Sequence, residues 1–210
     1  MTKVFSMTPA ELADFESNPP AVRALLTRAL ELTQRNLGYA YGSADPANGG
    51  MDCSGTIYYV LRECGIDEVP RTASEQYVWA RKADEFEAVV SRSKESFELD
   101  DLRPGDLLCW PGTYSTERDP PVTHTMIYLG QRKSDGRQVM FGASEGRTFD
   151  GEKMSGVSVF DFQIPKPRED GGGPGSVFIG YAKIPGLEAI AITDEKADAT
   201  SDSTIGEEHR

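Results

Sequence analysis

The chain has 210 residues, 38% hydrophobic and 27% charged, so it is long enough to bury a core without disulfide bonds and too apolar to be disordered throughout. Its net charge of −12 argues against binding to nucleic acid or to anionic lipid, because both are polyanions. No run of about 18 apolar residues occurs, so we expect no membrane span.

The three cysteines are too few, and odd in number, for a disulfide framework. Cys53 and Cys64 would stand about 16 Å apart on one helix, too far to bond. The segment 1–12 lacks the apolar stretch of a signal peptide, so we expect none in this chain.

Helical patterns occupy the first third of the chain. Thr8, Pro9 and Glu11 form a capping-box pattern that predicts a short helix ending before Pro19. Apolar residues then recur at helical spacing from residue 20 to a stop at Gly38. A third helix is predicted over 53–64, with an apolar stripe at Ile57, Val60, Leu61 and Cys64. Residues 83–99 receive no assignment.

After residue 105 the hydrophobic period changes to two. Short strands are predicted over 105–110, 123–129, 138–144, 157–162 and 177–184, and the glycine-rich stretch 171–175 is predicted to be a loop. Helices followed by consecutive strands predict an α+β fold with a largely antiparallel sheet. We expect a lead helix at 1–19, one domain at 20–187 and a disordered acidic tail at 188–210.

Cys53 is the candidate nucleophile, since it would lie in the first turn of the third helix with its thiol on the inward face. The positive end of the helix dipole and the free N–H groups there favour thiolate, which predicts a pKa below the ordinary value of about 8.5. The same N–H groups can hold the oxyanion of a tetrahedral intermediate. The competing interpretation is a small buried apolar residue, as we expect for Cys64 and Cys109.

His124 is the candidate general base. The chain has two histidines, and His209 lies in the predicted tail. His124 opens a predicted strand and shares a face with Met126 and Tyr128 by alternation, so it could stand across from Cys53. The competing interpretation is a half-buried strand histidine bonded to backbone.

Five short motifs follow one another along the chain. They are Tyr39-Ala40-Tyr41-Gly42-Ser43, Asp52-Cys53-Ser54-Gly55, Pro70-Arg71 with Gln76 five residues later, Pro104-Gly105-Asp106-Leu107, and His124 with Tyr128-Leu129-Gly130. In this order they resemble the motifs of the NlpC/P60 family of cell-wall cysteine peptidases. The resemblance covers roughly residues 20–185, and five motifs in family order argue against chance similarity.

The resemblance implies a papain-like α+β fold in which N-terminal helices, including the nucleophile helix, pack on a central antiparallel sheet. It implies hydrolysis of amide bonds in peptidoglycan stem peptides, typically from γ-D-glutamate to a diamino acid, with Cys53 as nucleophile and His124 as base. It also implies that Tyr39, with Tyr41 as the nearby alternative, supports the oxyanion or the substrate. A location in the periplasm, in the cell wall or outside the cell would follow.

Three polar residues are further candidates for the site, and two of them, Asp52 and Arg71, also have a structural interpretation. Asp52 and Ser54 could contact polar groups of the substrate, or Asp52 could cap the helix. Arg71 could line the cleft or hold its loop through an ion pair.

The family places a polar residue, often His, Asn or Gln, on the strand after the base strand, where it orients the histidine. Here Gly142 falls in that position and offers a backbone carbonyl alone. Ser144 faces the same way in a regular strand, but about 6–7 Å further along. We therefore expect the Gly142 carbonyl or a bridging water as the third group, with Ser144 in support.

Two other functions compete with the endopeptidase. One is an amidase or acyl transferase of the same superfamily, and the other is a catalytically weakened scaffold that binds cell-wall peptide. We expect no cofactor and no metal, because the cysteines lack CxxC spacing and the histidines are isolated. We expect a monomer.

Overall fold

The computed structural model describes residues 2–164 and 177–190. The predicted loop at 171–175, His209 and nearly all of the predicted acidic tail lie outside the described residues.

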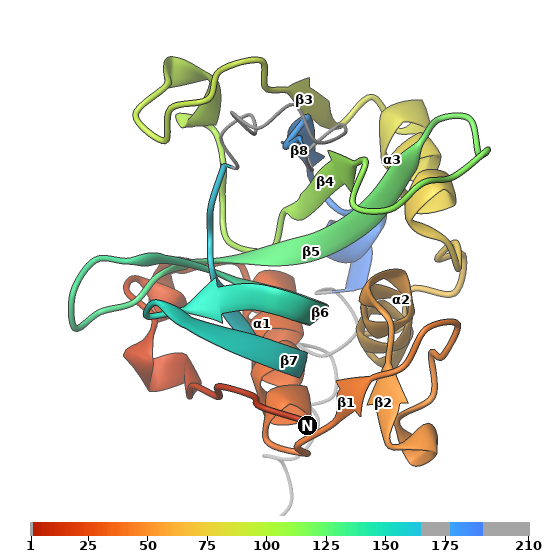
Figure 1. Cartoon of the computed structure of the whole chain (residues 1–210). Coiled ribbons are helices and arrows are strands. Elements are labelled where there is room, and N and C mark those ends of the chain that lie inside the picture. Colours follow the sequence, from red (N-terminus) through yellow and green to blue (C-terminus); the bar gives the residue numbers. More distant parts are fainter. Residues whose placement is uncertain (1, 165–176, 191–210) are drawn as a thin grey trace, which may run out of the picture.

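A six-stranded sheet forms the centre of the molecule (Figure 1). Its order is β3-β8-β4-β5-β6-β7, and every neighbouring pair is antiparallel. The strands are β3 (Phe86–Ala88), β4 (Leu107–Pro111), β5 (Val122–Gln131), β6 (Gln138–Phe149), β7 (Glu152–Asp161) and β8 (Gly180–Ala182). The predicted α+β class with a largely antiparallel sheet is confirmed.

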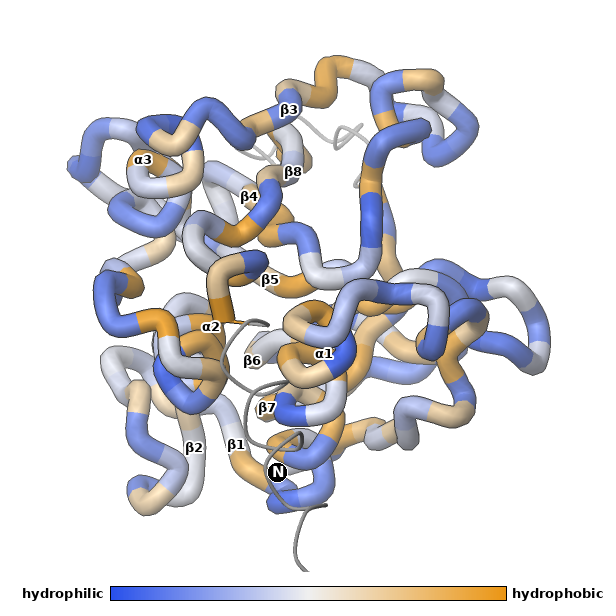
Figure 2. The backbone as a smooth tube through the Cα atoms, turned by 180° about the vertical axis from the view of Figure 1, so that it is seen from behind, coloured by the Kyte–Doolittle hydropathy of each residue, from blue (hydrophilic) through white to orange (hydrophobic). Residues whose placement is uncertain are grey.

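The sheet packs with the α-helices α1 (Pro20–Thr33), α2 (Cys53–Glu63) and α3 (Ala73–Lys82). Figure 2 shows α1 and α2 in front of β5, β6 and β7 when the molecule is seen from behind. The apolar stripes predicted for both helices face this sheet, where Leu25, Leu26, Ile57 and Leu61 are fully buried. The sequence therefore placed these two helices correctly.

The predicted first helix is replaced by two 3₁₀ turns, Pro9–Glu11 and Phe15–Ser17. The Thr8–Glu11 capping box is present. The helix cannot continue because Asp14 takes a left-handed conformation (φ 54°) and the Ala13 N–H donates to the Gln131 carbonyl on β5. Tertiary pairing with the sheet outweighs the local helical signal.

Helix α3 and the two-residue strands β1 (Gly38–Tyr39) and β2 (Gly50–Met51) are absent from the sequence prediction. A signal for α3 was available, since Thr72 and Glu75 form a complete capping box at its start. Strands β1 and β2 pair in parallel and align Tyr39 with Met51. This short ladder brings Tyr39 close to the start of α2.

The hairpin of β6 and β7 is longer than predicted. β6 continues five residues beyond Ser144 to Phe149, and the chain reverses at Asp150 and Gly151, both with positive φ. A β-bulge interrupts the β6–β7 register between Glu145 and Thr148. Among the described residues, no helix is both long and apolar enough to cross a membrane.

Candidate active site

The site is built on the first turn of α2. Asp52 is the N-cap of this helix, and its Oδ1 accepts from the Gly55 N–H at 2.6 Å, so the capping interpretation is confirmed. Cys53 follows at the first helical position and is buried. Gly55 is needed for close packing, because a Cβ there would lie 2.2 Å from the Ser43 carbonyl oxygen.

Arg71 ties the loop after α2 to this helix start. Its guanidinium binds Asp52 through both carboxylate oxygens, at 2.8 and 3.1 Å, and donates to Ser54 Oγ at 3.2 Å. The Asp52 Oδ2 also accepts from the Gly42 N–H at 2.8 Å. The ion pair predicted for Arg71 is therefore present, and the polar atoms of Asp52 and Ser54 are engaged within the protein.

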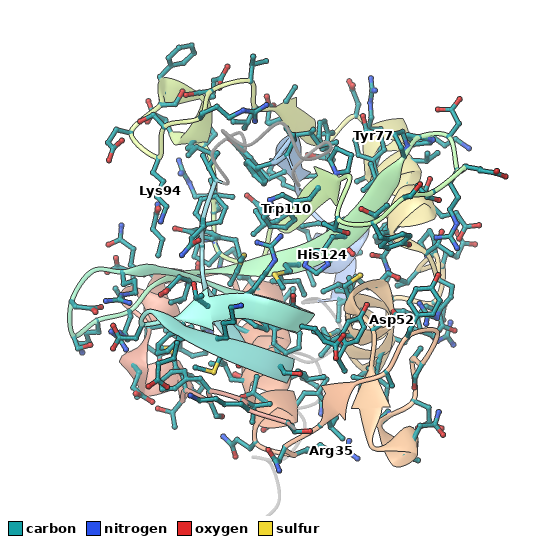
Figure 3. All side chains as sticks on the ribbon, in the orientation of Figure 1. Arg35, Asp52, Tyr77, Lys94, Trp110 and His124 are labelled. Carbon is teal, nitrogen blue, oxygen red and sulfur yellow. The ribbon has the colours of Figure 1, made fainter. Side chains whose placement is uncertain are left out.

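The nucleophile candidate and the base candidate come together from positions 71 residues apart in sequence. The Cys53 Sγ donates to the carbonyl oxygen of Thr123, the residue before His124, at 3.6 Å. Figure 3 shows His124 on β5 next to Trp110 on β4, with Asp52 nearby at the start of α2. The thiol hydrogen is thus directed to the backbone of β5.

The pKa of the Cys53 thiol is raised, contrary to the sequence prediction. Burial is the largest cause, and the charge of Asp52 acts in the same direction. Backbone N–H groups of Ser54 and Cys53 lower this pKa, as expected at a helix start, and so does the N–H of Thr125 on β5, but burial outweighs them. The resting site therefore favours the neutral thiol.

A cleft of about 230 Å³ opens beside Cys53. Tyr39, Arg71 and the loop between β4 and β5 line it, including Tyr114 and Arg118 of that loop. The pKa of Tyr39 is raised, first by burial and then by the charges of Cys53 and Asp52, so its hydroxyl stays protonated and can donate. Tyr41 also borders the cleft; it is 73% exposed and stacks edge-on against Tyr114.

The side chain of Gln76, noted above as part of a sequence motif, links three segments of the site by hydrogen bonds. Its side chain is fully buried, and its Nε2 donates to the Ser54 carbonyl at 2.9 Å and to the Pro70 carbonyl at 3.0 Å. Its Oε1 accepts from Thr125 Oγ1 at 2.7 Å. Gln76 thus fixes the start of α2 against β5 one residue beyond His124.

Arg147 is a site residue that the sequence analysis missed. Its Nε donates to His124 Nε2 at 3.2 Å, and its guanidinium carbon lies 4.3 Å from the centre of the Trp110 ring. Burial and then the Arg147 charge lower the pKa of His124 well below its usual value. The imidazole is therefore neutral at physiological pH.

The third catalytic group stays a prediction, and the structure adds a contact that was not expected. The His124 hydrogen bond found within the described residues comes from Arg147, a donor, rather than from the Gly142 carbonyl or Ser144. Gly142 lies on the expected face, because a Cβ there would come within 2.9 Å of Met126 Cγ. Ser144 is buried on the same strand.

The β6 bulge explains why Arg147 was missed. In a regular strand Arg147 would face away from Gly142 and Ser144, since its number differs from theirs by an odd count. The bulge inserts one extra residue opposite β7, and Gly146 within it has φ +98°. A glycine inside a predicted strand was the available signal.

No group of three His, Cys, Asp or Glu side chains suited to a metal occurs in residues 2–164 and 177–190. All three cysteines are free, and Cys109 is fully buried.

Comparison with known proteins shows the family to which this sequence belongs. The NlpC/P60 family profile matches residues 36–158, which hold Tyr39, Cys53, Arg71, His124 and Arg147. The chain belongs to the NlpC/P60 family. This membership confirms the resemblance drawn from the five motifs.

Two curated NlpC/P60 relatives are similar at low identity. A gamma-DL-glutamyl hydrolase from Bacillus subtilis is 28% identical over 136 residues, covering 61% of this chain and 27% of the relative. The murein DD-endopeptidase MepH from Escherichia coli is 28% identical over 95 residues, covering 45% of this chain and 29% of the relative. The matched region spans less than a third of either relative.

A crystal structure from Staphylococcus aureus, described as similar to lipoprotein and of the NLP/P60 family, supports the fold alone. It has a TM-score of 0.50 and 23% sequence identity, and the match covers 80% of this chain and 42% of that one.

Proposed function

We propose that this chain is a cysteine peptidase that hydrolyses amide bonds of peptidoglycan stem peptides, at the bond from γ-D-glutamate to a diamino acid. Cys53 is the nucleophile and His124 the general base. The observation that carries this proposal is the placement of the Cys53 sulfur at the first turn of α2, in contact with the residue before His124. The names of the two curated relatives, a glutamyl hydrolase and a murein endopeptidase, support the substrate class.

The reaction follows from these positions. His124 takes the thiol proton, and the Cys53 thiolate attacks the amide carbonyl carbon. In this proposal, backbone N–H groups of the first turn of α2 and the protonated Tyr39 hydroxyl donate to the resulting oxyanion, and the raised Tyr39 pKa supports the donor role of that hydroxyl. The His124 imidazolium then gives its proton to the leaving amine, and water hydrolyses the thioester.

Digestion of whole peptidoglycan, with mass spectrometry of the released muropeptides, tests the proposal. We expect Cys53→Ala to abolish release and His124→Ala to slow it by about two to four orders of magnitude. Cys64→Ala, at the other end of the same helix, is the matched control and should retain activity. Equal release by Cys53→Ala and the wild type would refute the proposal. Cleavage at another bond within the peptide would refute the bond proposed here, and release of the whole stem peptide from the sugar would indicate an amidase.

A binding scaffold is the second candidate, and two observations favour it. Arg147 donates a hydrogen bond to the His124 Nε2 lone pair, and the pKa of Cys53 is raised. Sedimentation with insoluble peptidoglycan distinguishes the two candidates. A scaffold would co-sediment without releasing fragments, and Cys53→Ala would not change its binding.

A further inference from the structure

The contact between Arg147 and His124 limits what the ring can do. A neutral imidazole has one N–H and one lone pair in its plane. Because Nε2 accepts from the Arg147 Nε–H, the lone pair is at Nε2 and the proton is on Nδ1. In this arrangement His124 has no free lone pair with which to take the Cys53 proton.

The Cys53 thiol is likewise not prepared for proton transfer to His124. Its hydrogen is directed to the Thr123 carbonyl and not to the imidazole. Thiol and imidazole are thus both neutral, and the cation in contact with the imidazole is Arg147. The charged groups near the pair are Arg147 on β6, Asp52 beside Cys53, and Glu145, whose charge acts on Tyr39. Two more cations line the cleft: Arg71, which is ion-paired with Asp52, and Arg118 of the β4–β5 loop.

Within residues 2–164 and 177–190, the Arg147 guanidinium has no anionic partner. No described carboxylate forms an ion pair with it, and the negative charge that bears on it is that of a Cys53 thiolate. Burial lowers its pKa to about 10, so it remains charged at neutral pH. Its two Nη groups make no hydrogen bond within the described part of the chain, and neither does the fully buried Nε1 of Trp110, against which it stacks.

We propose that Arg147 determines specificity by occupying the lone pair of His124 until a substrate carboxylate next to the scissile amide draws the guanidinium away. A carboxylate is the planar partner that a guanidinium prefers, and it accepts two parallel N–H bonds. Once freed, the ring can carry its proton on either nitrogen, so the nitrogen nearer Cys53 can present a lone pair to the thiol. Catalytic competence is thereby coupled to an anionic substrate, and this step rests on the proposed function.

The first test measures the position of the ring proton directly. In ¹⁵N NMR spectra of the full chain, with the His124 signals assigned by their loss in His124→Gln, we expect the Nδ1–H tautomer in the wild type at pH 7. Arg147→Met keeps an unbranched chain against Trp110 but removes the donor, so the pKa of His124 should rise and the tautomer should change. A wild-type ring protonated on Nε2 would overturn the proposal without need of any variant.

The second test uses two alkylating reagents that differ in a carboxylate. Iodoacetate and iodoacetamide attack the same thiol, so the ratio of their rates with Cys53 reports the charge next to it. We expect Arg147→Met to lower the iodoacetate-to-iodoacetamide ratio about tenfold. Arg132→Met is the control, because Arg132 also stacks on an aromatic ring, that of Phe149, and does not contact His124.

An unchanged ratio in Arg147→Met would show that Arg147 does not recognise a carboxylate at the reacting thiol, and would overturn the specificity role. Neither test uses peptidoglycan, so each result stands whether or not the chain digests the cell wall.

Discussion

Replacing Gln76 with leucine tests whether one buried amide holds the start of α2 against β5. The leucine has a similar volume but leaves three buried partners without their bonds: the Ser54 and Pro70 carbonyls and the Thr125 hydroxyl. At about 1 kcal/mol for each lost bond, the free energy of unfolding should fall by about 3 kcal/mol. For a chain of this size the melting temperature should fall by about 6–12 °C.

Urea unfolding followed by circular dichroism measures this free energy. The control is Gln163→Leu, which removes one exposed hydrogen bond to Thr148 and should change stability by less than about 0.5 kcal/mol. Below the melting temperature, muropeptide release by the Gln76→Leu variant should also be slower, because Thr125 adjoins His124. A loss of stability below about 1 kcal/mol would refute the bridging role.

Three further predictions concern residues around the site and the sheet. Asp52→Ala removes the cap of α2 and leaves Arg71 without its carboxylate, so urea denaturation should show a loss of about 2–3 kcal/mol. Burial raises the pKa of Asp106 to about 6, above roughly 3.9 in the unfolded chain, so the folded state binds this proton more tightly. The free energy of unfolding should therefore fall by up to about 3 kcal/mol as pH rises from about 4 to 6, and Asp106→Asn should abolish this fall. Gly142→Ala brings a Cβ within 2.9 Å of Met126 Cγ, and thermal melts should show a cost of about 1–3 kcal/mol.

Structural features that depend on residues close together in the sequence were predictable. The start of α2 follows from Asp52 as cap and from the apolar stripe behind Cys53, and both operate within one or two helical turns. The strand that begins near His124 follows from its alternating pattern. Their juxtaposition does not follow from spacing and came from the family resemblance.

Features set by tertiary packing were not predictable in the same way. The helix terminus was expected to lower the Cys53 pKa, and its N–H groups do act in that direction. Burial by neighbouring elements is the larger effect, and it depends on how β5 packs over α2. The lead segment likewise takes 3₁₀ turns because it pairs with β5.

Because β6 carries a one-residue bulge, the deletion or insertion of one residue can change this site in a way that a point substitution cannot. Deleting Gly146, in an exposed part of the hairpin, would restore regular alternation and turn Arg147 away from the histidine while every side chain of the site is retained. Related chains could thus gain or lose the guanidinium through a single codon insertion or deletion. Hairpin length, more than the identity of aligned residues, would then indicate which homologues have a guanidinium hydrogen-bonded to this histidine.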